Sequence, residues 1–128
     1  MQKNRLTNRP KNLNLFTISL PINAVVSILH RVSGIGLFLS IPLILLSLQS
    51  LVHSESSYVA LTGWLNTWFV KLMLVGLAWA FFHHFFAGIR HLLQDIHWMT
   101  SLNNARLSSR ILLWLVGATT LIFAFVIW

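Results

Sequence analysis

The sequence predicts an all-α integral membrane protein in which three transmembrane helices form a single membrane-anchor domain over residues 1–128. Two observations lead to this prediction. Of the 128 residues, 56% are hydrophobic and only 9% are charged, whereas soluble domains carry about 25% charged residues. The apolar residues also gather in three long runs, and each run provides the roughly 20 residues that a helix needs to cross a bilayer.

The first span is expected over about residues 22–50, directly after Pro21, because proline favours the first turn of a helix. Pro42 lies inside this span, which membrane helices tolerate better than soluble helices do. The second span is expected over about 64–93 and the third over about 110–128. Gly and Ser at the boundaries mark the ends of helices rather than linkers between domains.

The basic residues predict the orientation of these spans. The loop between the first two spans contains no Lys or Arg, whereas the loop between the second and third contains Arg106 and Arg110. The tail, residues 1–21, is also basic and contains Lys3, Arg5, Arg9 and Lys11. Because basic loops stay on the cytoplasmic side, we expect a cytoplasmic N-terminus and a periplasmic C-terminus.

Composition also limits function and location. The net charge of +7 lies in the tail and beside apolar segments, so the sequence offers no basic face for nucleic acid. The chain has no cysteine, which excludes disulfides, thiolate metal sites and thiol catalysis. No cleavable signal peptide is apparent. We therefore expect the bacterial inner membrane, or the mitochondrial inner membrane if the chain is encoded in an organelle.

A polar cluster interrupts the first span. Ser27, His30 and Arg31 are spaced i, i+3 and i+4, so they share one helical face, which Gly34 continues. An arginine at this depth costs roughly 2.5–3.5 kcal/mol on insertion scales. A residue that is costly in lipid indicates a functional site.

The second span carries a matching cluster in which His84, Gly88 and His91 share one face. The two spans run antiparallel. His30 and His84 each lie about nine residues from the inner end of their span, or roughly 13 Å along the helix. We therefore expect the two polar faces to meet at the same depth on the cytoplasmic side.

Two ligands suit such a site. An intramembrane histidine with a glycine one turn away can bind haem iron, because the glycine leaves room for the flat macrocycle. Haem propionates need cations or donors, which His30, Arg31 and Arg90 could supply, and quinone carbonyls need donors such as Ser27 and Arg31. Structural roles stay open: Arg31 can snorkel, Ser27 can bond to a backbone carbonyl four residues earlier, and a lone histidine can simply pack.

The clusters fall within two sequence signatures on the first and second spans. The first begins with Arg9-Pro10 and ends in SILHRVS, residues 27–33; the second is HFFAGIRHLLQD, residues 84–95. With these signatures the chain resembles the cytochrome b subunits of succinate dehydrogenase, the larger of the two small membrane anchors of that enzyme. The resemblance covers essentially the whole chain.

The resemblance implies a membrane subunit of a succinate:quinone oxidoreductase, respiratory complex II, which does not itself carry the succinate-oxidising site. Its partners would be a flavoprotein subunit, an iron–sulfur subunit and a second hydrophobic anchor that completes a helical bundle in membrane lipid. Electrons from succinate would pass through iron–sulfur clusters to ubiquinone or another quinone at the cytoplasmic membrane surface.

The resemblance also implies roles for the polar residues. His84 matches the axial ligand of haem b, and the second ligand would come from the other anchor subunit. Ser27 and Arg31 match quinone-binding residues. His30 and Arg31 match residues that lie close to the haem propionates.

Two positions depart from the family pattern. His83 precedes His84, so the sequence offers two adjacent candidate ligands pointing about 100° apart; the offset to the following glycine favours His84. After Asp95 the family usually has a small residue one position further on, where this chain has Ile96 followed by His97. The role of Asp95 is left open. His97 falls in the expected cytoplasmic loop, so a second haem is not expected.

Three alternative functions stay open at this point. The chain could anchor a fumarate reductase that runs in the reverse direction, or it could be an anchor that has lost its haem. It could also be a small proton or solute transporter subunit with the His and Arg residues along a path. A transmembrane path would need polar residues in the outer half, where the spans offer little beyond Gln49 and Lys71.

Overall fold

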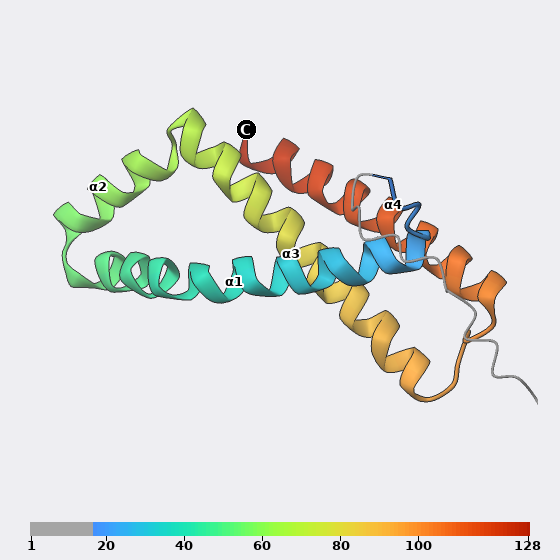
Figure 1. Ribbon diagram of the computed structural model, residues 1–128. Coiled ribbons are helices and arrows are strands. Elements are labelled where there is room, and N and C mark those ends of the chain that lie inside the picture. Colours follow the sequence, from blue (N-terminus) through green and yellow to red (C-terminus); the bar gives the residue numbers. More distant parts are fainter. Residues whose placement is uncertain (1–16) are drawn as a thin grey trace, which may run out of the picture.

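The computed structural model describes residues 17–128, which form four helices (Figure 1). They are α1 (Ile22–His53), α2 (Glu55–Leu65), α3 (Trp68–Asp95) and α4 (Leu102–Ile127). The part of the chain that the structure describes contains no strand. The four basic tail residues and the Arg9-Pro10 pair lie outside the described residues.

Three of the helices, α1, α3 and α4, are long and apolar enough to cross a membrane, which confirms the predicted three-span all-α fold. The helix α4 begins at Leu102, ahead of the expected start near residue 110. Its N-cap is Ser101, whose side chain accepts a hydrogen bond from the backbone N–H of Asn104 at 3.4 Å. The first turn of α4 is polar, so the apolar pattern did not indicate that the helix begins here. Ser101 is nevertheless a favourable N-cap residue.

Between α1 and α3, where a loop was expected, the structure has the short helix α2. Ser54 caps it by accepting a hydrogen bond from the backbone N–H of Ser57 at 3.2 Å, and Glu55 lies in its first turn. Both features stabilise the positive N-terminal end of a helix. The sequence therefore contains the N-terminal features of a helix, although its serine-rich composition favoured a loop.

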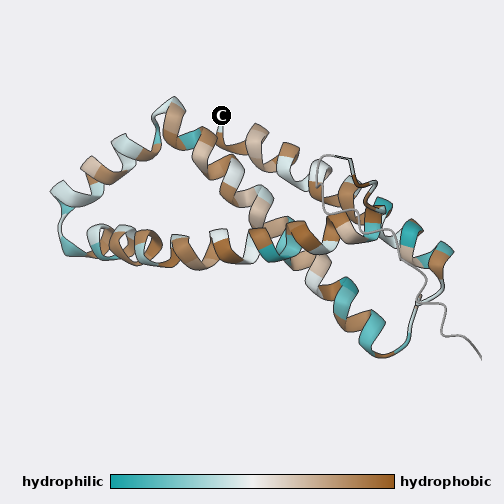
Figure 2. Cartoon of the chain, in the orientation of Figure 1, coloured by the Kyte–Doolittle hydropathy of each residue, from teal (hydrophilic) through white to brown (hydrophobic). Residues whose placement is uncertain are grey.

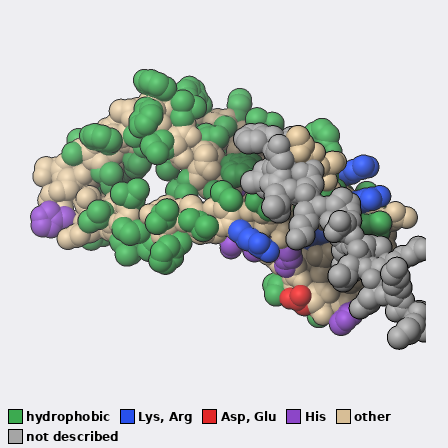
Figure 3. Space-filling model, in the orientation of Figure 1, with side chains coloured by type: hydrophobic (Ala, Val, Ile, Leu, Met, Phe, Trp, Pro, Cys, Tyr) green, Lys and Arg blue, Asp and Glu red, His purple; other side chains and the backbone are tan. Residues whose placement is uncertain are grey.

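The helix α3 lies beside α4 from its N-terminal end onward, and it crosses α1 (Figure 1). A small core lies where α1, α3 and α4 meet and consists of Val26, Ala87, Leu112 and Val116. Most large apolar side chains are exposed instead, as the green surface in Figure 3 shows. Such a surface suits lipid or other membrane helices, while the hydrophilic residues gather near the crossing and around the loop between α3 and α4 (Figure 2).

That loop has an unusual backbone. His97 and Met99 adopt φ angles of 62° and 57°, in the left-handed region. This conformation costs roughly 1–2 kcal/mol for a residue with a side chain. The loop folds the chain sharply enough for α4 to return beside α3.

Candidate haem and quinone site

The two predicted polar clusters meet where α1 and α3 pack together. The rings of His30 and His84 stack with their centroids 4.3 Å apart and their planes 11° from parallel. Nδ1 of His84 lies 3.1 Å from the backbone carbonyl oxygen of His30. Ring stacking and this hydrogen bond together fix the orientation of His84.

Gly34 makes this contact possible. A Cβ atom at this position would lie 2.9 Å from Cε1 of His84 and 3.2 Å from its Nδ1, which is closer than carbon atoms pack. Gly88 has a looser environment, because a Cβ there would meet only Nε2 of His30, at 3.7 Å. The close approach of α1 to His84 therefore depends on Gly34, the glycine of the first cluster.

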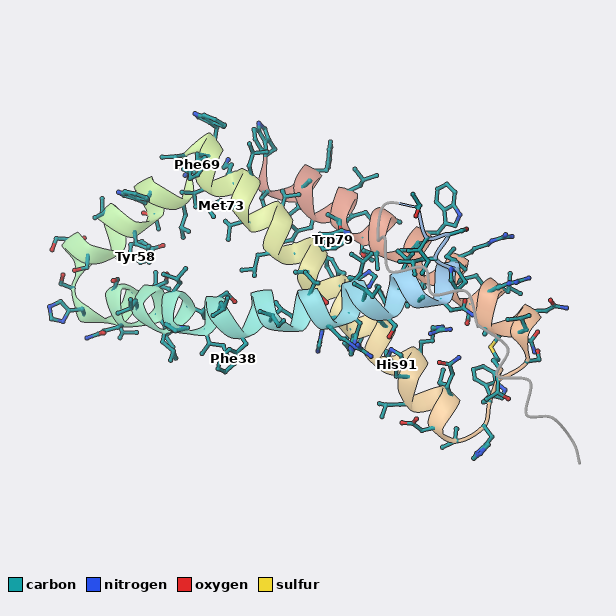
Figure 4. All side chains as sticks on the ribbon, in the orientation of Figure 1. Phe38, Tyr58, Phe69, Met73, Trp79 and His91 are labelled. Carbon is teal, nitrogen blue, oxygen red and sulfur yellow. The ribbon has the colours of Figure 1, made fainter. Side chains whose placement is uncertain are left out.

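His91 extends the cluster by one more ring. Its centroid lies 5.1 Å from that of His30, with the planes tilted by 54°. Figure 4 labels this residue beside α1, just beyond the crossing. Three histidines from two helices thus form a continuous group, and His30 lies at its centre.

Beside this group lies an open hollow of about 410 Å³. Arg31 and Phe38 line it together with His30, Gly34, Ile35 and His84. The Arg31 side chain is exposed, and Figure 3 shows a basic side chain next to histidines in this part of the surface. A cation and a partly exposed imidazole therefore face the same space.

Ser27 differs from the other serines of α1. The hydroxyls of Ser33, Ser40, Ser47 and Ser50 each donate to a backbone carbonyl three or four residues earlier. The Ser27 hydroxyl makes no hydrogen bond with any residue from 17 to 128. It is half-buried on the N-terminal side of His30, so its donor is available to a ligand.

His83 has a different environment from its neighbour. It is fully buried, its Nε2 lies 3.2 Å from the carbonyl oxygen of Val26, and its ring stacks on Trp79 at 5.4 Å. Its Nδ1 is buried and has no hydrogen-bond partner among the described residues. The ring is enclosed by protein and packs α3 against α1.

Arg90, which the sequence offered as one possible propionate donor, forms its hydrogen bonds with α4. Its Nε donates to the hydroxyl of Ser108 at 3.0 Å, and its Nη2 donates to the carbonyl oxygen of Ala105 at 3.3 Å. The hydroxyl of Ser109 donates in turn to Asn23 of α1 at 3.0 Å. The structure thus uses Arg90 to join α3 to α4.

Sequence reasoning overlooked the serines of this contact. Ser108 and Ser109 lie at the start of an apolar span, where hydroxyls need hydrogen-bond partners. The residues before about 110 were expected to form a loop, so no contact of these two serines with another helix was predicted.

The chemistry of His84 fits one axial ligand of a haem. When Nδ1–H donates to the His30 carbonyl, Nε2 keeps its lone pair, which is the form that binds a metal. Nε2 has no partner among the described residues, and the side chain is partly exposed beside the hollow. Within the same residues no group of three or more potential ligands could hold a metal ion.

Comparisons with known proteins agree with these features. Residues 5–125 match the family model described as the succinate dehydrogenase/fumarate reductase transmembrane subunit. A succinate dehydrogenase cytochrome b556 subunit from Coxiella burnetii is 39% identical over 103 residues, covering 79% of this chain and 82% of the relative. The subunit of the same name from Paracoccus denitrificans is 32% identical over 106 residues, covering 83% and 82%. A succinate dehydrogenase cytochrome b560 subunit from Reclinomonas americana is 33% identical over 121 residues, covering 90% and 83%.

Proposed function

Because the chain belongs to the family of succinate dehydrogenase/fumarate reductase transmembrane subunits and is a cytochrome b membrane anchor of succinate dehydrogenase, we propose that the crossing of α1 and α3 forms its ligand site. In this proposal His84 is an axial ligand of haem b. Ser27 and Arg31 bind quinone, and His30 and Arg31 contact the haem propionates.

The hydrogen bond from His84 to the His30 carbonyl carries the proposal. It holds the imidazole in one tautomer and leaves its other nitrogen without a partner among the described residues. Such an outer contact typically accounts for 10–100-fold in metal affinity. A bound haem supplies one-electron redox chemistry, while this chain supplies the ligand, its orientation and the surrounding charge.

Arg31 supplies most of that charge. It lines the same hollow as His84, and a guanidinium can donate several charge-assisted hydrogen bonds to propionate or to a quinone carbonyl. His30 stacks on the proposed ligand and lines the same hollow. Arg31 thus sits where both ligands could share its donors.

Ser27 supports the quinone part of the proposal through its unused hydroxyl. Reducing a quinone to a quinol adds two electrons and two protons at the carbonyl oxygens. Hydrogen bonds from Ser27 and Arg31 would orient those oxygens and stabilise the negative charge that develops on them. The electrons would come from the iron–sulfur subunit of the complex.

The proposed partners follow from the family to which the chain belongs. Oxidation of succinate and delivery of electrons would require a flavoprotein subunit and an iron–sulfur subunit. The second haem ligand would come from a second hydrophobic anchor. We place the complex in the bacterial inner membrane, or in the mitochondrial inner membrane for an organelle-encoded chain, with residues 1–21 and the α3–α4 loop on the side of the soluble subunits.

Activity measurements on the purified complex test the quinone assignment. Ser27→Ala and Arg31→Gln should reduce succinate-dependent quinone reduction by about tenfold or more, the usual loss when a specific donor is removed at a charged centre. Succinate oxidation by an artificial dye acceptor should be unchanged, because that reaction does not need the membrane site.

Ser40→Ala is a matched control, because Ser40 donates to its own helix backbone at 2.7 Å. It should leave both activities unchanged. If Ser27→Ala and Arg31→Gln also left quinone reduction at the wild-type rate, these residues would not belong to the quinone site.

A further inference from the structure

A second hollow lies between the C-terminal half of α1 and the N-terminal half of α3. It has a volume of about 720 Å³ and almost entirely apolar walls. Its lining residues come from α1, α2 and α3 and include Leu39, Leu43, Leu65, Met73, Leu74 and Leu77. These residues belong to α2 and to the halves of α1 and α3 that adjoin it; Figure 1 shows the arrangement of the three helices.

Two glycines on its walls have no packing partner within the described chain. A Cβ atom at Gly36 or Gly76 would meet nothing within 4 Å. Glycine in a helix interior costs about 1 kcal/mol relative to alanine, and here no internal contact offsets that cost. An apolar molecule in the hollow could contact the helix backbones closely at both glycines.

A smaller hollow, lined by both polar and apolar residues, adjoins the apolar one. It is lined by Thr62, Asn66 and Lys71, and it shares Leu65 and Leu74 with the larger hollow. Its presence means that a polar group and an apolar chain of one molecule could occupy adjacent spaces.

Lys71 provides the positive charge beside the smaller hollow. The Lys71 ammonium lies 5.9 Å from the ring centroid of Trp128, and it forms no ion pair with any of residues 17–128. Trp64 and Trp68 lie exposed at the same end of α3, as tryptophans do at the headgroup level of a bilayer. Lys71 is therefore placed where a lipid phosphate would lie.

We propose that these hollows bind one anionic glycerophospholipid, with its phosphate at Lys71 and an acyl chain between α1 and α3. The adjoining hollow with its polar residues and the Lys71 ammonium beside Trp128 favour a lipid over a helix from another subunit, because a lipid has a charged headgroup next to its acyl chains. The lipid fills a gap that the chain leaves open and joins α1 to the α2–α3 connection.

Native mass spectrometry of the intact complex tests this proposal. Delipidated complex is incubated with equal amounts of phosphatidylglycerol and phosphatidylcholine, and bound lipids are counted. Lys71→Gln should lower the preference for phosphatidylglycerol about fivefold, the effect of one lysine near a phosphate. Gly76→Leu should lose one bound lipid of either kind, because its side chain enters the apolar hollow.

Two variants serve as matched controls. Gly117→Leu makes the same change at another helix glycine with open surroundings outside the hollow. Arg106→Gln removes an exposed cation from α4. Both should bind lipid as the wild type does. Wild-type lipid counts and selectivity in Lys71→Gln and Gly76→Leu would overturn the proposal.

A crosslinking experiment distinguishes lipid from a protein occupant. The chain has no cysteine, so Met73→Cys can carry a single photoreactive group into the hollow. Adducts with phospholipid are expected, and an adduct with another subunit would overturn the proposal. The haem spectrum and quinone reduction of the same samples report separately on the α1–α3 crossing.

Discussion

At the scale of single residues, two adjacent histidines have different environments because they point in different directions from α3. His83 is fully enclosed and packs between α1 and Trp79. His84 is partly exposed beside Arg31, with one nitrogen engaged and one available. The sequence offered both as candidate ligands and favoured His84 by its offset to Gly88; the difference in burial is consistent with that preference.

Gly34 provides a sharp prediction at this scale. In Gly34→Ala the new methyl group would displace His84, since the added atom would lie 2.9 Å from its ring. Haem affinity of the purified complex should fall by about tenfold, the effect of disturbing an outer contact of a ligand. Haem titration with spectroscopic detection measures this.

Gly36→Ala is the control for that experiment. Gly36 lies two residues away on the same helix, and a Cβ there meets nothing within 4 Å. Its haem affinity should equal that of the wild type. Equal affinities in Gly34→Ala and the wild type would mean that the His84 ring does not depend on this close approach.

At the scale of the helices, Arg90 and the serines of α4 determine how α3 and α4 join. Long apolar runs predicted the three spans, because a bilayer demands that pattern from any helix that crosses it. The pattern does not say which neighbour a polar residue meets. Arg90 was therefore only one possible donor to a haem propionate, and the structure shows it bonded to Ser108 and Ala105.

A double-mutant cycle tests this contact. Arg90→Gln and Ser108→Ala should each lower the free energy of unfolding by about 1–3 kcal/mol, because each leaves a buried polar partner unsatisfied. The double variant should lose less than the sum of the two, since both remove the same hydrogen bond. Thermal inactivation of the complex gives the relative shifts, and strictly additive shifts would contradict the contact.

At the scale of the whole molecule, the meeting of the two polar clusters was predictable from the sequence. Antiparallel spans with polar residues at equal distances from the same surface bring those residues together, as His30 and His84 show. The helix α2 and the early start of α4 were not predicted, because a short capped helix and the polar first turns of a long one carry little apolar periodicity. The hollows beside α1 depend on the angle at which helices cross, which the sequence pattern does not encode.

The orientation of the molecule leads to a further prediction. In a chain without cysteine, Ser54→Cys and Ser101→Cys place single thiols at opposite ends of the spans. In intact cells a membrane-impermeant maleimide should label Ser54→Cys, and Ser101→Cys only after permeabilisation. The reverse pattern would contradict a cytoplasmic N-terminus and would separate residues 1–21 from the proposed soluble partners.

The haem assignment of His84 is central to the account, and one comparison tests it most directly. Reduced-minus-oxidised spectra, with succinate as the reductant, are recorded for the co-purified complex carrying His84→Gln or His83→Gln. The account predicts a lost or altered b-type haem spectrum for His84→Gln and a wild-type spectrum for His83→Gln, whose amide can still donate to Val26. An unchanged spectrum with full haem content in His84→Gln would contradict it.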